Sequence, residues 1–122
     1  MTNDDKDRKY NLEERTAKFG EEIIKFARKM SEGSVTTPII IQLVKSGTSI
    51  GANYCEADDA ESGQDFRHKI GICKKESREC KHFLRMSAVA APEAADRARK
   101  LWAEAKELNL IFNSIYKKIK KS

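Results

Sequence analysis

QLVKSGTSIGANYCEADDA, residues 42–60, is the stretch from which the architecture of the whole chain can be worked out. Gly47 and Gly51 lie four residues apart in it, and Tyr54 follows three residues later, so all three fall near one face of a helix. Each glycine costs a helix about 1 kcal/mol relative to alanine, and close approach of a neighbouring backbone is the usual gain that offsets this cost. We therefore predict that Gly47, Gly51 and Tyr54 serve helix packing, with a loop that breaks the helix at Lys45 as the alternative.

The helix that contains this stretch is predicted to cover residues 38–60. Thr37 can cap its start, and Pro38 suits the first helical position, where a missing N–H costs nothing. The isoleucines at 39–41 would also suit a strand, but apolar residues continue at helical spacing as far as Ile50. No further proline interrupts the segment, which favours a continuous helix.

A first helix over about residues 12–31 is indicated by apolar residues that alternate at spacings of four, three and four. Gly33 lies just past its end, where helices commonly stop. The preceding residues 1–11 are polar and mixed in charge, and we expect a flexible leader there. The core-facing residues of this helix are Phe19, Ile23, Phe26 and Met30.

Two more helices are predicted in the second half of the chain, over residues 63–90 and 92–119. Ser62 is a candidate N-cap for the third helix, and Asp65 places a carboxylate in its first turn, where the helix dipole favours negative charge. Pro92 ends the third helix and opens the fourth. The core-facing residues are Phe66, Ile70, Cys73, Ser77, Cys80 and Leu84, followed by Leu101, Ala105, Leu108, Phe112, Ile115 and Ile119.

Four long helices with connections of a few residues predict an all-α fold. Short connections force neighbouring helices to run antiparallel, so we expect an up-down-up-down four-helix bundle. A chain of 122 residues is long enough for one modest core, and residues 12–122 should form a single domain.

The composition bears on where the protein resides. Charged residues make up 35% of the chain and hydrophobic residues 39%, which is typical of a helical protein with a hydrated surface. No run of about 18 apolar residues could span a membrane. The polar N-terminus lacks the apolar core of a signal peptide, so we expect a cytoplasmic protein.

Positive charge gathers in the second half of the chain. Residues 1–61 have a net charge of −3, from 9 basic and 12 acidic residues, whereas residues 62–122 have +8, from 15 and 7. Five cations are spaced along the third helix to form a stripe about 27 Å long, which could follow the phosphates of a nucleic acid. We predict nucleic-acid binding by this stripe (Arg67, Lys74, Arg78, Lys81 and Arg85) and by the C-terminal tail (Lys117, Lys118, Lys120 and Lys121).

A solvated, partly neutralised face is the alternative interpretation of the stripe. Lys75 and Glu79 are four residues apart, a spacing that supports ion pairs on a helix. Arg78 could also be buried against Glu56 of the second helix. Aromatic side chains that would stack on bases are scarce on this helix, and Trp102 is expected to flank the core, so base stacking is not expected.

The sequence contains no recognisable catalytic signature. A phosphate-binding glycine loop and the Glu-x-x-His pair of di-metal bundles are both absent. Neither His68 nor His82 is placed near a serine or cysteine in a way that specifies a nucleophile. We therefore expect that the protein is not an enzyme and needs no cofactor.

Metal binding is also not expected. The spacings between Cys55, Cys73 and Cys80 match no common zinc signature, so we interpret them as reduced cysteines, with a metal site that includes a histidine as the alternative. Carboxylates at positions 58, 59 and 61 oppose the dipole at the end of the second helix. A solvated turn explains them, and a metal or a basic partner is the alternative.

Two segments carry a resemblance to a known family. The first is residues 42–54, continued by Glu56-Ala57, and the second combines DFRHKI (65–70) with KESRE (75–79) and CKHFLR (80–85). Together they resemble the four-helix bundle proteins of the 23S rRNA intervening-sequence type. The resemblance is close over the second and third helices and extends to the first and fourth only in pattern and length.

This resemblance implies a homopentamer of antiparallel four-helix bundles. Similar proteins are encoded within inserts in bacterial ribosomal RNA genes, and a related branch assists the reverse transcriptase of diversity-generating retroelements, where nucleic-acid binding is implied. The family offers no catalytic residues to carry over. Apolar residues outside the core seams could form the subunit interface: Ile39, Ile41, Ile72, Phe83, Trp102 and Ile111.

Two functions therefore stay open at the level of the sequence. The first is a non-catalytic oligomer that binds nucleic acid, with RNA favoured over DNA. The second is a structural or adaptor oligomer that holds a protein partner, such as a reverse transcriptase, and binds no nucleic acid.

Overall fold

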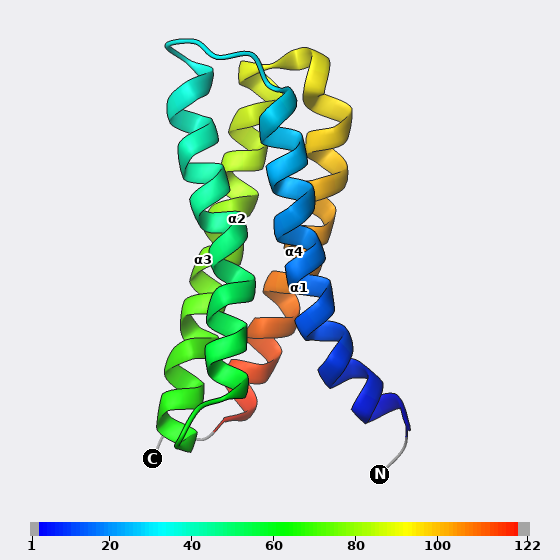
Figure 1. Ribbon diagram of the computed structural model, residues 1–122, viewed down its shortest axis with the longest axis vertical. Helices are drawn as coiled ribbons and strands as arrows, with labels where there is room; N and C mark the ends of the chain where they lie inside the picture. The colour runs from blue at the N-terminus through cyan, green and yellow to red at the C-terminus, as the bar shows by residue number, and fades with distance from the viewer. Residues whose placement is uncertain (1–2, 120–122) are drawn as a thin grey trace.

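The computed structural model describes residues 3–119 of the chain, with side chains from residue 11 onward. Its elements are α1 (Asn3–Lys29), α2 (Thr36–Asp58), α3 (Gly63–Ala90), a short 3₁₀ turn η1 (Pro92–Ala94) and α4 (Ala95–Lys118). The described part of the chain contains no strand, and the four helices run alternately up and down, as Figure 1 shows. The prediction of an all-α four-helix bundle is confirmed. Within residues 3–119, no helix combines the length and apolar character needed to cross a bilayer.

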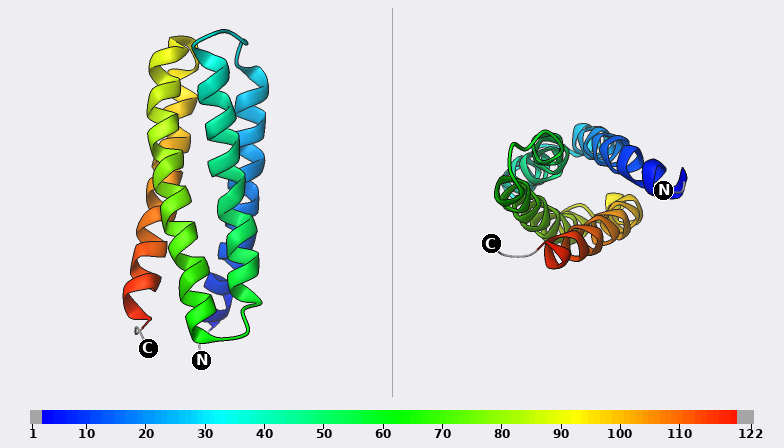
Figure 2. Two further views of the ribbon diagram at one scale, coloured as in Figure 1. Left: turned by 90° about the vertical axis from the view of Figure 1, so that its left-hand side faces the viewer. Right: turned by 90° about the horizontal axis from the view of Figure 1, so that it is seen from below.

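The helices are arranged around the bundle in chain order. α2 packs between α1 and α3, and α4 packs on the other side of α3 (Figure 2). α1 and α4 complete the ring only in part, since they diverge toward the end of the molecule where both chain termini lie (Figures 1 and 2). Ion pairs join α1 and α4 across this last seam, including Arg15 with Glu104 and Glu22 with Arg97.

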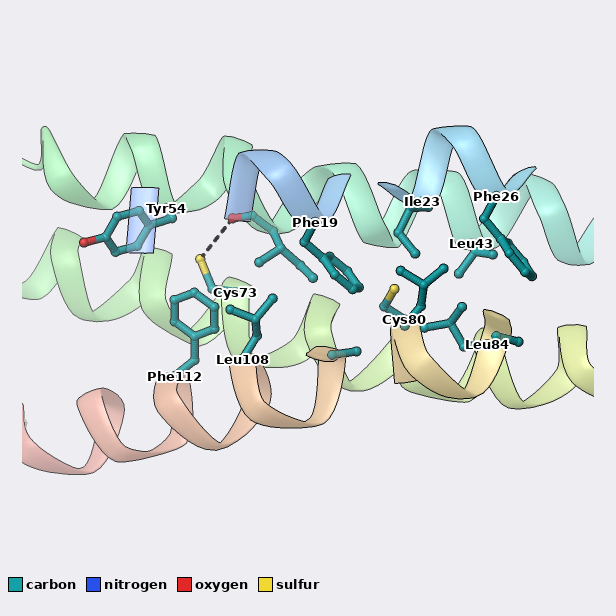
Figure 3. Close-up of a cluster of buried hydrophobic side chains, with 14 of the residues drawn as sticks. Phe19, Ile23, Phe26, Leu43, Tyr54, Cys73, Cys80, Leu84, Leu108 and Phe112 are labelled. Atoms are coloured by element: carbon teal, nitrogen blue, oxygen red, sulfur yellow. Dashed lines mark hydrogen bonds between the residues drawn. The ribbon is translucent and has the colours of Figure 1, made fainter. Parts of the chain in front are cut away.

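The core is built from the seams that helical periodicity predicts. Figure 3 shows apolar side chains from all four helices that meet inside the bundle. Fully buried positions include Ile23, Leu43, Leu84 and Phe112. The two cysteines of α3 are also part of this core: Cys73 donates an S–H hydrogen bond to the carbonyl oxygen of Ile50 at 3.5 Å, and Cys80 is equally buried.

The glycines of α2 lie where α1 comes close. A Cβ atom on Gly47 would meet Cγ1 and Cγ2 of Ile23 at 2.9 Å, and one on Gly51 would lie 3.4 Å from the backbone carbonyl of Thr16. The absence of a side chain at these positions therefore allows α1 and α2 to pack closely. Tyr54 instead turns into the core, where its ring centroid lies 6.1 Å from that of Phe112.

Helix ends differ from expectation in the first half of the chain. α1 begins at Asn3 and ends at Lys29, so the first helix starts earlier than the predicted residue 12 and includes part of the expected leader, residues 1–11. α2 begins at Thr36, and Thr37 does not cap it: its hydroxyl accepts a hydrogen bond from the Gly33 N–H at 3.1 Å. Pro38 still lies in the first turn, where its missing N–H leaves no helical hydrogen bond unmade.

The boundaries of α3 follow from its caps. Ser62 has an extended backbone conformation, and its hydroxyl accepts a hydrogen bond from the Asp65 N–H at 3.0 Å, as an N-cap does. α3 ends at Ala90, before Pro92. Pro92 opens the 3₁₀ turn rather than α4 itself, which starts three residues later at Ala95.

Candidate nucleic-acid interface

A groove of about 830 Å³ runs along the surface where α3 and α4 pack together. Both helices supply its walls, and α3 provides most of its charge. We call it the α3–α4 groove. Its lining residues are Gly71, Lys74, Lys75, Arg78, Glu79, Lys81 and His82 from α3, and Asn109, Asn113 and Tyr116 from α4.

Two asparagines of α4 form the polar floor of this groove. The side-chain amide of Asn109, which is 8% exposed, donates to the Lys74 carbonyl oxygen at 2.9 Å and to the Ser77 hydroxyl at 3.0 Å. Asn113 in turn donates to the Asn109 side-chain oxygen at 3.3 Å. These bonds fix the relative positions of α3 and α4 and keep apolar side chains out of the floor. Sequence reasoning missed both asparagines, although Asn109 directly follows the core residue Leu108.

One end of the groove is closed by Tyr116. A Cβ atom on Gly71 would lie 3.2 Å from the Tyr116 ring, so the glycine admits this ring against α3. The guanidinium carbon of Arg67 lies 3.8 Å from the ring centroid, and Arg67 also donates to the Tyr116 hydroxyl at 2.7 Å and to the Ile119 carbonyl oxygen at 3.3 Å. Arg67, predicted as a phosphate contact, therefore uses its donors to hold the end of α4 on α3.

The indole of Trp102 lies toward the other end of the same helix pair. The ammonium groups of Lys81 and Lys106 lie 5.4 Å and 5.5 Å from its ring centroid. The ring is partly buried and packs against the core. The expectation that Trp102 flanks the core is confirmed. α4 nevertheless brings Trp102 and Tyr116 beside cations of α3, a proximity that the sequence of α3 alone does not predict.

Most of the stripe is free of carboxylate partners. Among the side chains that the structure describes, the cations paired with acids are Arg15, Lys25, Lys69, Arg97 and Arg99. Lys75 and Glu79 do not form the ion pair that their spacing allows. Glu56 binds Lys69 at 2.9 Å and not Arg78, which is exposed. Lys74, Arg78, Lys81 and Arg85 thus form no ion pair with a described carboxylate.

The basic tail is only partly described. Lys117 and Lys118 are exposed in the last turn of α4, directly after Tyr116. Lys120 and Lys121 lie outside the described residues.

Two of the three cysteines lie in the core. Burial raises the pKa of the Cys73 and Cys80 thiols to about 12, so both stay protonated at neutral pH, while Cys55 is exposed. All three are free thiols. No group of three or more potential metal ligands occurs in the described part of the chain. Asp58 lies beside Tyr54 and contributes to a rise in the pKa of this phenol that is due first to burial.

A sequence profile of the family described as "23S rRNA-intervening sequence protein" matches residues 8–114. The chain belongs to this family. The family resemblance carried by α2 and α3 is thereby confirmed. The matched region contains the α3 cations, Trp102 and both groove asparagines, and it ends two residues before Tyr116.

A solved structure supports the same membership. The crystal structure of a protein with unknown function from the S23 ribosomal protein family of Bacteroides thetaiotaomicron superimposes with a TM-score of 0.77. The two sequences are 26% identical, and the alignment covers 87% of this chain and 98% of that one. A search of curated proteins found no match to this chain.

Proposed function

We propose that this protein is a non-catalytic, oligomeric nucleic-acid-binding protein that contacts phosphate groups, in the first place those of RNA, along α3. The observation that carries the proposal is the set of α3 cations that form no ion pair with a described carboxylate: Lys74, Arg78, Lys81 and Arg85. Cations that are not neutralised within the chain keep their full attraction for an external polyanion.

The dimensions of this surface suit several phosphates. From Lys74 to Arg85 a helix rises about 17 Å, and phosphates of one strand in a duplex follow each other at about 3.4 Å along the axis. The surface therefore covers the rise of about five phosphates, and each of the four cations can contact one of them without a change in the helix. Lys117 and Lys118 extend the basic surface at the end of α4.

A salt titration tests this proposal directly. Binding of a structured RNA and of a duplex DNA should weaken as salt rises, with a log–log slope of roughly −0.7 to −0.9 for each phosphate contacted. Replacement of Arg78, Lys81 and Arg85 by glutamine should weaken binding to all sequences alike and flatten that slope.

The matched control changes the same amount of charge elsewhere. Replacement of Lys18, Arg28 and Lys29 by glutamine removes three exposed cations of α1 and should leave the slope almost unchanged. If the α3 triple variant binds as tightly as the wild type, the binding site must instead be the basic tail. If neither nucleic acid binds at about 50 mM salt, where electrostatic binding is strong, the proposal is wrong.

An adaptor for a protein partner is the second candidate, and exposed apolar side chains favour it. Ile41 is 59% exposed, Leu110 57% and Val89 75%. Large apolar side chains at this exposure suit a protein interface, either with further copies of the chain or with a partner such as a reverse transcriptase. Retention of such a partner by a protein that binds no nucleic acid would support the adaptor.

A further inference from the structure

We infer that the α3–α4 groove takes single-stranded RNA, with one base stacked on Trp102. This inference rests on the proposed function and narrows it to one class of nucleic acid. It goes beyond phosphate contact because it assigns a role to an aromatic side chain of α4.

The environment of Trp102 provides the first argument. Lysine ammonium groups from two helices, Lys81 of α3 and Lys106 of α4, lie over its ring. Lysine side chains are flexible, and their interaction with an indole near the surface is weak. A base can therefore replace a lysine over the ring, and the released ammonium group can then bind the phosphate of the same nucleotide. Aromatic groups beside cations are the usual combination in proteins that bind single strands.

The depth of the groove provides the second argument. Arg78 and Arg85 are exposed, whereas Lys74 and Lys81 are partly buried beside the polar floor. A rigid duplex can reach the exposed arginines, but its bases are stacked inside it and cannot reach Trp102. A single strand can enter the groove, contact the partly buried lysines and turn a base onto the indole.

The distance from Tyr116 to Trp102 sets the size of the ligand, because Trp102 lies outside the groove lining, beside the groove residue Lys81. Tyr116 closes one end because Arg67 and Gly71 hold its ring against α3. Trp102 lies 14 residues earlier on α4, a rise of about 21 Å. This span suits about four nucleotides, at the lower end of the known range of single-strand sites.

Trp102 is the only tryptophan in the sequence, so its fluorescence reports on this position alone. We would titrate the full chain at low salt with an unstructured oligouridylate of about ten nucleotides, an RNA hairpin with as many phosphates whose loop is replaced by a non-nucleotide linker, and inorganic polyphosphate. The oligouridylate should bind and quench the fluorescence strongly. The hairpin and the polyphosphate should bind with little quenching.

Substitutions separate stacking from charge, with RNA binding followed through a dye on the RNA and polyphosphate binding followed by titration calorimetry. Trp102→Leu should weaken oligouridylate binding roughly 5- to 100-fold and change polyphosphate binding less than about twofold. Trp102→Phe keeps an aromatic face and should retain most of the affinity, which also guards against a folding defect in the leucine variant. Phe66→Leu removes a partly buried aromatic ring of α3 outside the groove and should have no effect.

The outcomes distinguish the inference from the proposal on which it rests. If the hairpin and polyphosphate bind but the oligouridylate does not quench Trp102, or if both Trp102 variants bind like the wild type, the proposed function stands and the single-strand inference falls. If none of the three polyanions binds, both fall. Equal weakening of hairpin and oligouridylate by Trp102→Leu with a normal thermal melt would also overturn the inference.

Discussion

At the scale of single residues, Glu76 of α3 is a buried carboxylate with an unsatisfied oxygen atom. It is 9% exposed, and its Oε2 atom has no hydrogen-bond partner in the described part of the chain. Burial raises its pKa first, and the nearby Glu79 adds to the rise, while Lys75 and Lys45 lower it. The fold therefore disfavours the charged form of this side chain.

We predict that Glu76→Gln stabilises the protein at pH 7 by about 1 kcal/mol, since the substitution removes a poorly solvated charge at nearly constant shape. Because the pKa is raised in the folded state, the wild-type protein should gain stability as the pH falls from the folded pKa toward the ordinary value of 4.5. The advantage of the variant should shrink over that same range.

Urea unfolding at pH 7 and at pH 4 measures both effects, and Glu14→Gln on exposed α1 is the control, for which no gain is expected. Destabilisation of the Glu76→Gln variant at pH 7 would instead indicate that Lys45 and Lys75 together stabilise the carboxylate more than burial disfavours it.

At the scale of elements, the close contact between α1 and α2 depends on the absence of a side chain at Gly47. Gly47→Leu should cost on the order of 1–3 kcal/mol through overpacking against Ile23, whose side-chain atoms already lie 2.9 Å from the position of an added Cβ. In an Ile23→Ala background the same leucine has space, so the two substitutions together should cost less than their sum.

Thermal melting measures this coupling. Gly63→Leu is the control, because a Cβ atom on Gly63 meets nothing within 4 Å. An unchanged melting temperature for Gly47→Leu would show that α1 and α2 are not held at this distance.

Sequence periodicity could predict the helices and the core because each repeats within one segment of the chain. Residues such as Leu84 and Phe112 lie where a three-four spacing places them. The α3–α4 groove could not be predicted in this way, because it requires the relative position of two helices. The bond from Asn109 to Lys74 joins residues 35 positions apart, and Trp102 meets Lys81 only after the helices pack.

Helix starts were harder to predict than helix interiors. Thr37 and Pro38 form a plausible start signal, but the hydroxyl of Thr36 is bonded back to the Ser31 carbonyl oxygen at 2.6 Å, and the helix begins at Thr36. Local hydrogen bonds of the preceding loop decide such details.

At the scale of the whole molecule, the proposed homopentamer would cover apolar surface that one chain leaves exposed. Light scattering should give a mass of about 70 kDa, five times the 13.9 kDa of the chain. Ile41→Glu or Leu110→Glu should shift the protein toward smaller species if these residues lie between subunits. Val35→Glu, in the loop at the end of the bundle, is the control. A mass of 13.9 kDa at micromolar concentration would contradict the pentamer.

The divergence of α1 from α4 also has a consequence for how the molecule opens. Before Phe19, Leu12 is the one large apolar side chain that the described part of α1 buries. The link from Arg15 to Glu104 and Glu107 is electrostatic and partly solvated. Salt weakens such a link, whereas the apolar packing of Ile23 and Phe26 is insensitive to it. Amide hydrogens near Arg15 should therefore exchange with solvent sooner than those around Phe26, and their exchange should become faster as ionic strength rises. The first turns of α1 would then unfold locally while the rest of the bundle stays folded.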